Sequence, residues 1–576
     1  TFHYNDDGVV TREIDALGGE WLTEWDSKFN VTKRVNPLGQ VSSYTFDTNG
    51  NLISAEDPTG AKLSWEYDAA GLLVLRTDAA GATETLTYDD NGNVKRITDA
   101  TGGEVAFRRG KKGEVLRVEL PGGGQERIYY DHLMRPRMQL SADGHETQMR
   151  YDVEGRLTMV QDGEGQVTQY TVARSASNPR GAVTDIKLPD GATTEIAYDT
   201  EGMMAALTDG EGQSRRFTYG AFDLPISATD STGGVMTLEH DREMRLTAVI
   251  NALGERYEYT YDAVGALIGE RDFSGLVTRY IRDAASRVAK KIAPDGVETT
   301  YSYSDRGDLL EMQVGDAVTR FEYDARGLMT LAANADATVE YSYDALGRVI
   351  SEKLDGREVK SAYGASSGLR IERSGDVMPL EVGYSHGGLM QELRVGNREA
   401  LQFQYDKRGL EVLRQSATGF AMAQGYTANA QLSAQVAGHI DQLPDDARQG
   451  MMSISTRYDP SYGAAARTYR RFDWDKAGRA VGIADAKWGQ TRFSYDPRGQ
   501  VGAVQQIDKS GYEAARTQFA YDATRNITGV QTAQGQEPVQ QAKGGRVLAR
   551  GKAFYRYDAC GRVIEKRVEE PGFRPK

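Results

Sequence analysis

Apolar and polar residues alternate in short runs along most of the chain, and each run ends in a segment that contains glycine. Around Tyr67, for example, apolar residues stand two positions before it at Trp65 and six positions after it at Leu73. Thr, Glu, Arg and Lys fill much of the space between such positions. Alternation with period two, over short runs bounded by glycine turns, predicts β-hairpins.

An aromatic-Asp-x-x-Gly motif recurs at the ends of these runs. Its aromatic positions are evenly spaced, beginning at Tyr4, Trp25, Phe46, Tyr67 and Tyr88. The step becomes one position shorter at Tyr323, Tyr343 and Tyr363, and then returns to its first value at Tyr384, Tyr405 and Tyr426. Repetition at such a period predicts one supersecondary unit per repeat, stacked in an array. The clearest copies, which we take as the structural motif of the repeat, are Tyr67, Asp68, Gly71; Tyr88, Asp89, Gly92; Tyr151, Asp152, Gly155; Tyr261, Asp262, Gly265; Tyr343, Asp344, Gly347; Tyr405, Asp406, Gly409; Tyr495, Asp496, Gly499; and Tyr557, Asp558, Gly561.

A second set of glycines lies half a repeat away from the first. Gly18, Gly39 and Gly60 begin one run with the same step as the early aromatic residues; this run continues to Gly165, and a later run goes from Gly212 to Gly296. Each repeat therefore has two turns, which leave room for two strands of about six residues, the usual strand length.

Each residue of the motif has a physical role in this scheme. The aspartate can accept a hydrogen bond from a backbone N–H two residues on, and the glycine takes a positive φ without steric cost. The tyrosine ring ends one strand and can cover the next hairpin. A single hairpin is marginally stable in water, so the array is expected to be stable only as a whole.

These features predict an all-β fold, a long antiparallel hairpin array. A sheet this wide must twist and coil, so we expect a hollow β-cocoon or spiral shell, of which this chain forms all or part. Breaks in the period divide the chain. The expected divisions are a repeat array at 1–171, an irregular insertion at 172–194, a repeat array at 195–426, an irregular insertion or loop at 427–473, and a repeat array at 474–576 with a looser stretch at 529–550.

The composition agrees with a thin sheet and argues against several functional and structural classes of protein for this chain. Hydrophobic residues make up 39% of the chain, and there are 64 glycines and 31 tyrosines. The net charge of -14 argues against a nucleic-acid carrier, which should show a basic surface. Cys560 is the one cysteine, so no disulfide framework forms within the chain. We see no transmembrane segment and no signal peptide, and since Thr1 lies inside a repeat we expect a piece of a longer product.

Candidate chemical motifs are weak. Gly364-Ala365-Ser366-Ser367-Gly368 has the spacing of a nucleophile elbow, but it falls on the scheduled turn after Tyr363 and lacks a strand–turn–helix context. The six histidines show no ligand spacing, and the Asp-x-x-Gly turns lack the acidic positions of a calcium loop. We therefore assign no catalytic, cofactor-binding or metal-binding residues, and no cofactor.

The YDxxGR element, clearest at 343–348 and 557–562, resembles the Rhs/YD-repeat family. That family includes bacterial polymorphic toxins, type VI secretion effectors, the C components of insecticidal Tc toxins, and animal teneurins. The resemblance implies a β-cocoon that encapsulates a C-terminal toxin domain and stays in the bacterial cytoplasm until it is secreted and delivered into a target cell. The family's DPxG-type self-cleavage segment is not found; Asp459-Pro460-Ser461-Tyr462-Gly463 and Asp57-Pro58-Thr59-Gly60 are only superficially similar.

The leading hypothesis is a non-enzymatic shell segment that acts in interbacterial competition or virulence. Its implied partners are the remaining Rhs shell and the C-terminal toxin domain of the parent protein, with a secretion spike protein, a chaperone and an immunity protein as further candidates, and no nucleic acid. The alternative is a cell-surface adhesion or glycan-binding YD-repeat protein. A third and weaker hypothesis is a hydrolase that uses Ser366.

Overall fold

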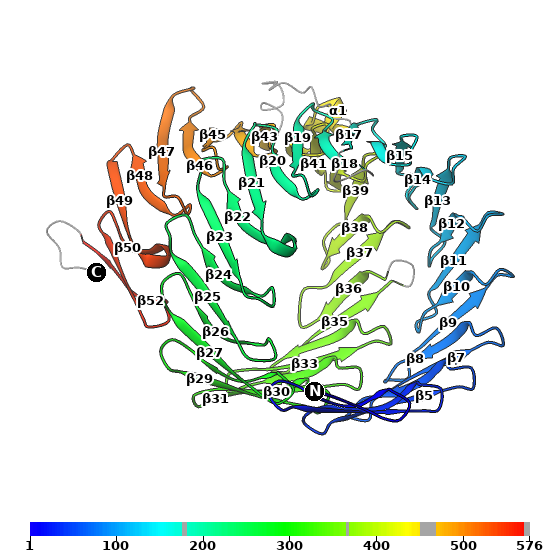
Figure 1. The fold of residues 1–576 in the computed structure, drawn as a ribbon. Helices are drawn as coiled ribbons and strands as arrows, with labels where there is room; N and C mark the ends of the chain where they lie inside the picture. The colour runs from blue at the N-terminus through cyan, green and yellow to red at the C-terminus, as the bar shows by residue number, and fades with distance from the viewer. Residues whose placement is uncertain (175–180, 365–367, 450–467, 570–576) are drawn as a thin grey trace. The chain divides into compact units, whose positions relative to one another are not determined.

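The computed structural model describes residues 1–174, 181–364, 368–449 and 468–569. Within these ranges the chain is nearly all antiparallel β-structure, from β1 (Phe2–Tyr4) to β52 (Val563–Val568). Strands pair with their neighbours in chain order and form one long sheet (Figure 1). The prediction of an all-β hairpin array is therefore confirmed.

One repeat shows how the sequence builds the sheet. β5 (Val41–Phe46) pairs with β6 (Leu52–Glu56), with a register shift at the aromatic residue, so that Phe46 lies opposite Leu52. β6 then pairs with β7 (Lys62–Tyr67), where Glu56 lies opposite Lys62. The five residues after an aromatic strand end are called the YD loop, and the loop at the other end of the hairpins, such as 57–61, is called the second loop.

The second loops change length along the chain. Five residues separate paired strand ends from the early repeats up to Ile292 and Glu298. Some later loops are shorter, and only two residues separate Val314 from Ala317 or Leu354 from Arg357, whereas five again separate Ile507 from Glu513. This shortening accounts for the smaller step between the aromatic positions in this part of the sequence.

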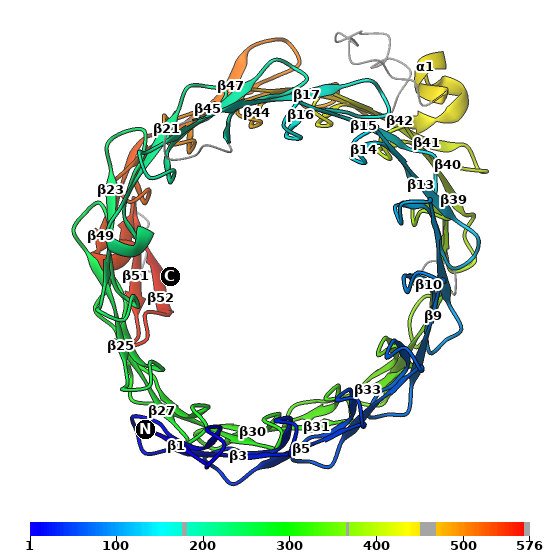
Figure 2. The same ribbon diagram turned by 45° about the vertical axis from the view of Figure 1, so that its right-hand side comes forward.

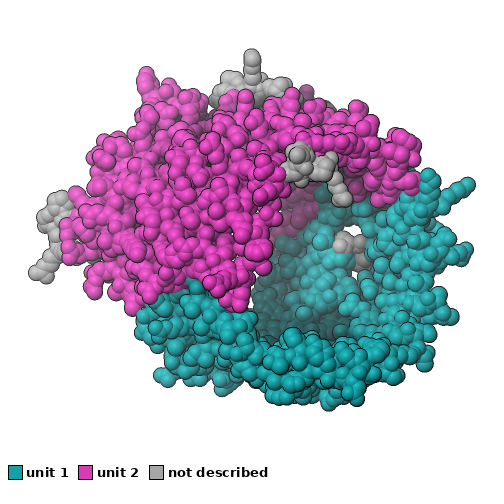
Figure 3. Space-filling view, viewed as in Figure 1, with its two compact units in different colours: residues 1–127, 259–270, 277–389 teal, residues 128–258, 271–276, 390–576 magenta. Residues whose placement is uncertain are grey.

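The structure divides into two compact units (Figure 3). Unit 1 comprises residues 1–127, 259–270 and 277–389, and unit 2 comprises residues 128–258, 271–276 and 390–576. Each unit therefore contains an early and a late stretch of hairpins, which we call its early and late ribbons. In unit 1, the early ribbon includes β5 and the late ribbon includes β31 (Ala317–Tyr323), and both strands can be followed in the two ribbon views (Figures 1 and 2).

The sheet is thin, and much of both faces remains accessible to solvent. The accessible surface is 33132 Å², whereas a compact protein of this mass would expose about 20,000 Å². Among the described residues, a packed apolar cluster lies where α1 (Asp445–Arg448) contacts β41 (Phe420–Tyr426). Its largest members are Tyr469, Leu413 and Leu443.

The stretches expected to be irregular also contain strands. β18 (Ala182–Lys187) lies in 172–194, and β42 (Leu432–His439) lies in 427–473 before α1. The stretch 529–550 contains most of β48 (Ile527–Thr532) and all of β49 (Gly535–Ala542) and β50 (Arg546–Arg550). Other short helical turns are η1 (Ala221–Asp223), η2 (Ile440–Gln442) and η3 (Lys543–Gly545).

Candidate functional site

The YD loop is organised by its aspartate. Asp344 Oδ1 accepts the backbone N–H groups of Leu346 at 2.9 Å and of Arg348 at 3.0 Å, while the N–H of Gly347 donates to the Asp344 carbonyl. Gly347 has φ 77°, which a side chain would make costly. The same two aspartate contacts occur at Asp68, Asp89, Asp152, Asp262, Asp406, Asp496 and Asp558, each with a positive-φ glycine at Gly71, Gly92, Gly155, Gly265, Gly409, Gly499 and Gly561.

The motif tyrosine joins one repeat to the repeat before it. Tyr67 Oη donates to the carbonyl of Leu52 at 3.0 Å. The β6–β7 ladder runs from Ser54 to Glu56, so Leu52 lies beyond its last pair, and the phenol supplies a donor where the backbone ladder has ended. Equivalent bonds are made by Tyr88, Tyr151, Tyr343, Tyr405, Tyr495 and Tyr557. Tyr261 is the last residue of β25 (Arg256–Tyr261).

An arginine at the last position of a YD loop connects successive YD loops, as Arg135 does after Met134, which has φ 64°. The sequence alone did not suggest this role. Arg135 Nε donates to Asp131 Oδ2 at 2.6 Å, and a terminal nitrogen donates to the carbonyl of Asp152 in the next loop at 2.9 Å. Its guanidinium also lies 4.9 Å from the ring centre of Tyr151. The sequence signal for this contact was the arginine in the position that ends the YDxxGR element, which Arg135 occupies in Tyr130-Asp131-His132-Leu133-Met134-Arg135.

The pKa values of the loop aspartates and of the motif tyrosines are shifted in opposite directions. Burial favours a raised pKa at Asp344, but hydrogen bonds from the Arg348 side chain and backbone outweigh it and hold the pKa below its usual value. Burial, together with the nearby Glu411 and Asp406, raises the pKa of Tyr426 to about 12. The loops are therefore most stable with charged aspartates and neutral tyrosines.

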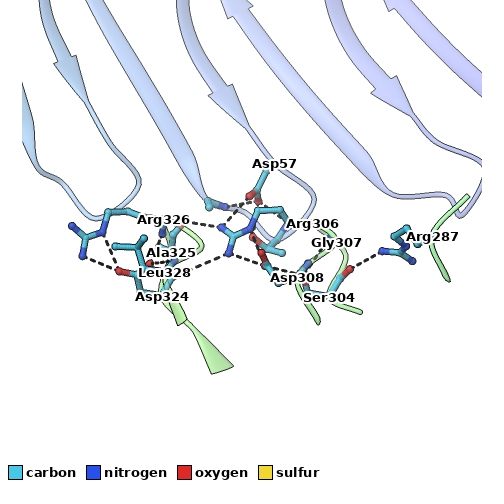
Figure 4. A network of polar contacts seen from close by, with 12 residues as sticks. Asp57, Arg287, Ser304, Arg306, Gly307, Asp308, Asp324, Ala325, Arg326 and Leu328 are labelled. Atoms are coloured by element: carbon cyan, nitrogen blue, oxygen red, sulfur yellow. Dashed lines mark hydrogen bonds and ion pairs between the residues drawn. The ribbon is translucent and has the colours of Figure 1, made fainter. Parts of the chain in front are cut away.

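Within unit 1, second loops of the early ribbon meet YD loops of the late ribbon. Asp57 lies 3.4 Å from Arg306, which also pairs with Asp308 at 2.8 Å and donates to the carbonyl of Ala325 at 2.8 Å (Figure 4). Gln40 Nε2 similarly donates to Asp305 at 3.3 Å. We call this loop-to-loop boundary between two ribbons the seam.

Unit 2 has a seam of the same kind. Lys407 N–H donates to Glu164 Oε1 at 3.0 Å, and Arg479 donates to Gln213 Oε1 at 3.1 Å. Farther along, Gly544 N–H donates to Glu255 Oε1 at 2.8 Å. The contacting residues are 243 to 289 positions apart in the chain.

The other chemical candidates add no site to this geometry. Ser366, with Ala365 and Ser367, lies outside the described residues, as does Asp459-Pro460. In the described part of the chain, no group of three or more His, Cys, Asp or Glu side chains is arranged to hold a metal ion. No helix in the same ranges is long and apolar enough to cross a membrane.

Comparison with known families agrees with the repeat geometry. An RHS-repeat model matches residues 46–83, and a teneurin YD-shell model matches residues 226–366. These two matches, in different parts of the chain, support its likeness to the Rhs/YD-repeat family. A curated protein similar to this chain is a probable deoxyribonuclease RhsB of Dickeya dadantii (strain 3937), with 28% identity over 198 residues, which are 34% of this chain and 12% of that protein.

The fold also resembles those of solved structures. A crystal structure of TcdB2-TccC3-Cdc42 matches with a TM-score of 0.62 and 11% identity, over 96% of this chain and 39% of that chain. The Photorhabdus luminescens Tc holotoxin pore matches with a TM-score of 0.53 and 12% identity, over 100% of this chain and 38% of that chain. The chain spans well under half the length of these relatives, and the structural likeness shows the fold.

Proposed function

We propose that this chain is a wall segment of a shell that encloses a C-terminal toxin domain and carries it into a target cell. The observation that supports the proposal is the seam, because it joins the loops of one hairpin ribbon to the loops of another within each unit. A sheet one layer thick that is joined in this way is suited to separate two spaces, since its area is large for the length of chain used.

The same features give the chain a structural role. Its polar contacts hold loops and strand ends together, as in the Asp344–Arg348 and Asp57–Arg306 pairs. We assign it no catalytic step, so any toxin activity would belong to another part of the parent protein. The proposed partners are that toxin domain, the rest of the shell, and a spike protein, chaperone and immunity protein used in delivery.

Proteolysis of the complete parent protein tests the proposal. We expect proteinase K to leave the toxin domain intact in the native parent protein and to digest it when that domain is expressed alone. Disruption of the seam by Arg306→Ala should make the enclosed domain more accessible to the protease. Equal digestion in the native parent protein and in the isolated domain would refute encapsulation.

A surface adhesion role is the second candidate, because the teneurin YD-shell model covers residues 226–366. Glycan-array binding by the intact chain, together with complete digestion of any C-terminal domain in the protease experiment, would favour adhesion over encapsulation. Protection of that domain without glycan binding would favour the shell.

A further inference from the structure

Two second loops in the early ribbon of unit 2 share both a sequence and a contact. The loops at 162–165 and 209–212 both read Asp-Gly-Glu-Gly. Glu164 Oε1 accepts the backbone N–H of Lys407 at 3.0 Å, and Glu211 Oε1 accepts the backbone N–H of Lys476 at 2.8 Å. Both lysines directly follow the aspartate of a YD loop, so the two sites are chemically equivalent.

The first glycine of each loop allows the lysine carbonyl to approach. A Cβ added to Gly163 would overlap the carbonyl oxygen of Lys407, and one added to Gly210 would overlap that of Lys476. Neither glycine has a positive φ, so the requirement comes from the opposite ribbon and not from the turn. Each loop therefore contacts both the N–H and the carbonyl group of one lysine.

At a third position of the seam, both facing loops differ from the first two pairs, and the two differences match each other. The late loop there begins Asp496-Pro497, and proline has no backbone N–H. The facing early loop carries Thr232 where the other two carry glutamate, and Ser231 where they carry glycine. Ser231 Oγ donates to the carbonyl of Pro497. The glutamate carboxylate is thus missing from the early loop where the backbone N–H donor is missing from the late loop.

We propose that early second loops recognise the backbone of the residue after the YD aspartate in a particular late loop, and that this recognition fixes the register of the two ribbons in unit 2. The partner is a segment of the same chain. A mismatched register would place a glutamate against Pro497 or leave the Lys407 and Lys476 N–H groups without that acceptor, which disfavours it. This recognition between loops would hold whether or not the chain encloses a toxin domain.

The first experiment measures hydrogen exchange at the Lys476 amide in the full chain. Glu211→Ala should raise its exchange rate about tenfold, because a hydrogen bond to a charged acceptor is lost. Glu211→Gln keeps an acceptor oxygen and should have a smaller effect. The control Glu201→Ala removes the same charge from an exposed position in an early YD loop and should leave the Lys476 amide unchanged. Equal rates in all four proteins would overturn the proposal.

The second experiment separates backbone recognition from a lysine–glutamate ion pair. Lys476→Ala keeps the backbone N–H, whereas Lys476→Pro removes it at a position where Pro497 already fits the same kind of loop. Exchange in the 209–213 loop should rise about tenfold in the proline variant and stay near the wild-type rate in the alanine variant.

A rescue variant completes the test. Adding Glu211→Thr to Lys476→Pro removes the glutamate whose donor has been lost, as at the Pro497 site, and should return part of the lost protection. Gly210 is kept, because a Cβ there would overlap the carbonyl oxygen of the facing residue. Equal effects of alanine and proline at Lys476, or a rescue variant no better protected than Lys476→Pro alone, would refute recognition through the backbone.

Discussion

Replacement of Asp344 by alanine tests whether the motif aspartate holds the YD loop together. The change removes four contacts. The backbone N–H groups of Leu346 and Arg348 donate to Oδ1, and Arg348 Nε and Nη2 both lie 2.7 Å from Oδ2. Asp344→Asn keeps an oxygen in the Oδ1 position but loses the charge. The two variants therefore separate the backbone contacts from the ion pair.

The expected cost follows from the exposure of these groups. The Asp344 side chain is 17% exposed and that of Arg348 is 22% exposed, so solvent replaces the lost contacts only in part. Hydrogen bonds to charged groups contribute about 1.5–3 kcal/mol each when they are well shielded. Since Leu346 is exposed and can bond to water, we expect about 2–3 kcal/mol in total for Asp344→Ala and about 1 kcal/mol for Asp344→Asn.

Hydrogen exchange of the loop measures this cost locally, which suits a repeat array that opens in parts. The amides of residues 344 and 347 are good reporters, because they donate to backbone carbonyls that the substitution leaves in place. Their exchange should accelerate about 30- to 150-fold in Asp344→Ala. Asp90→Ala, which removes an exposed carboxylate from another YD loop, should have little effect on its own loop. Equal effects of Asp344→Ala and Asp344→Asn, or no effect of either, would refute the assigned role.

Three further predictions concern the strand ends, the arginines and pH. Tyr343→Phe removes the 2.6 Å bond to the carbonyl of Met329 and should cost about 1 kcal/mol, seen as faster exchange in β32 (Met329–Ala333) and β33 (Thr338–Tyr343); unchanged exchange would contradict it. Arg135→Lys keeps the charge but loses the forked contact to Asp131 and the next loop, so the amides of residues 152–156 should exchange faster, whereas an unaltered rate would mean that charge alone suffices. Burial favours a raised pKa at several loop aspartates, but hydrogen bonds outweigh it and lower the pKa, so their stabilisation is full above the ordinary aspartate pKa and is lost as pH falls below it. Urea midpoints should fall between about pH 4 and pH 2, and a midpoint independent of pH in that window would refute this linkage.

The sequence predicts the parts of the fold that depend on local chemistry. The contacts within one YD loop join residues two to four positions apart, so Asp344 and Gly347 carry their own conformational preferences. Two turns per repeat likewise predict the hairpin array. The role of Arg135 was missed although its position at the end of the YD loop was visible, because its second contact reaches the next repeat.

The seam could not be predicted from the sequence in the same way. Asp57 and Arg306 are 249 residues apart, and Glu164 and Lys407 are 243 residues apart. A repeat array offers many equivalent loops, and its period does not specify which loops from distant repeats will meet. The duplicated Asp-Gly-Glu-Gly sequence was a visible signal, but its meaning depends on the close approach of a carbonyl at Gly163.

The seam also alters how the array can come apart. In a simple row of hairpins, each hairpin has two neighbours, and unfolding can pass from one to the next at the cost of a single interface. A hairpin that ends in Lys407 or Arg306 has a third neighbour from a distant part of the chain. Its opening must break that additional boundary, so damage in one repeat is less able to spread along the row.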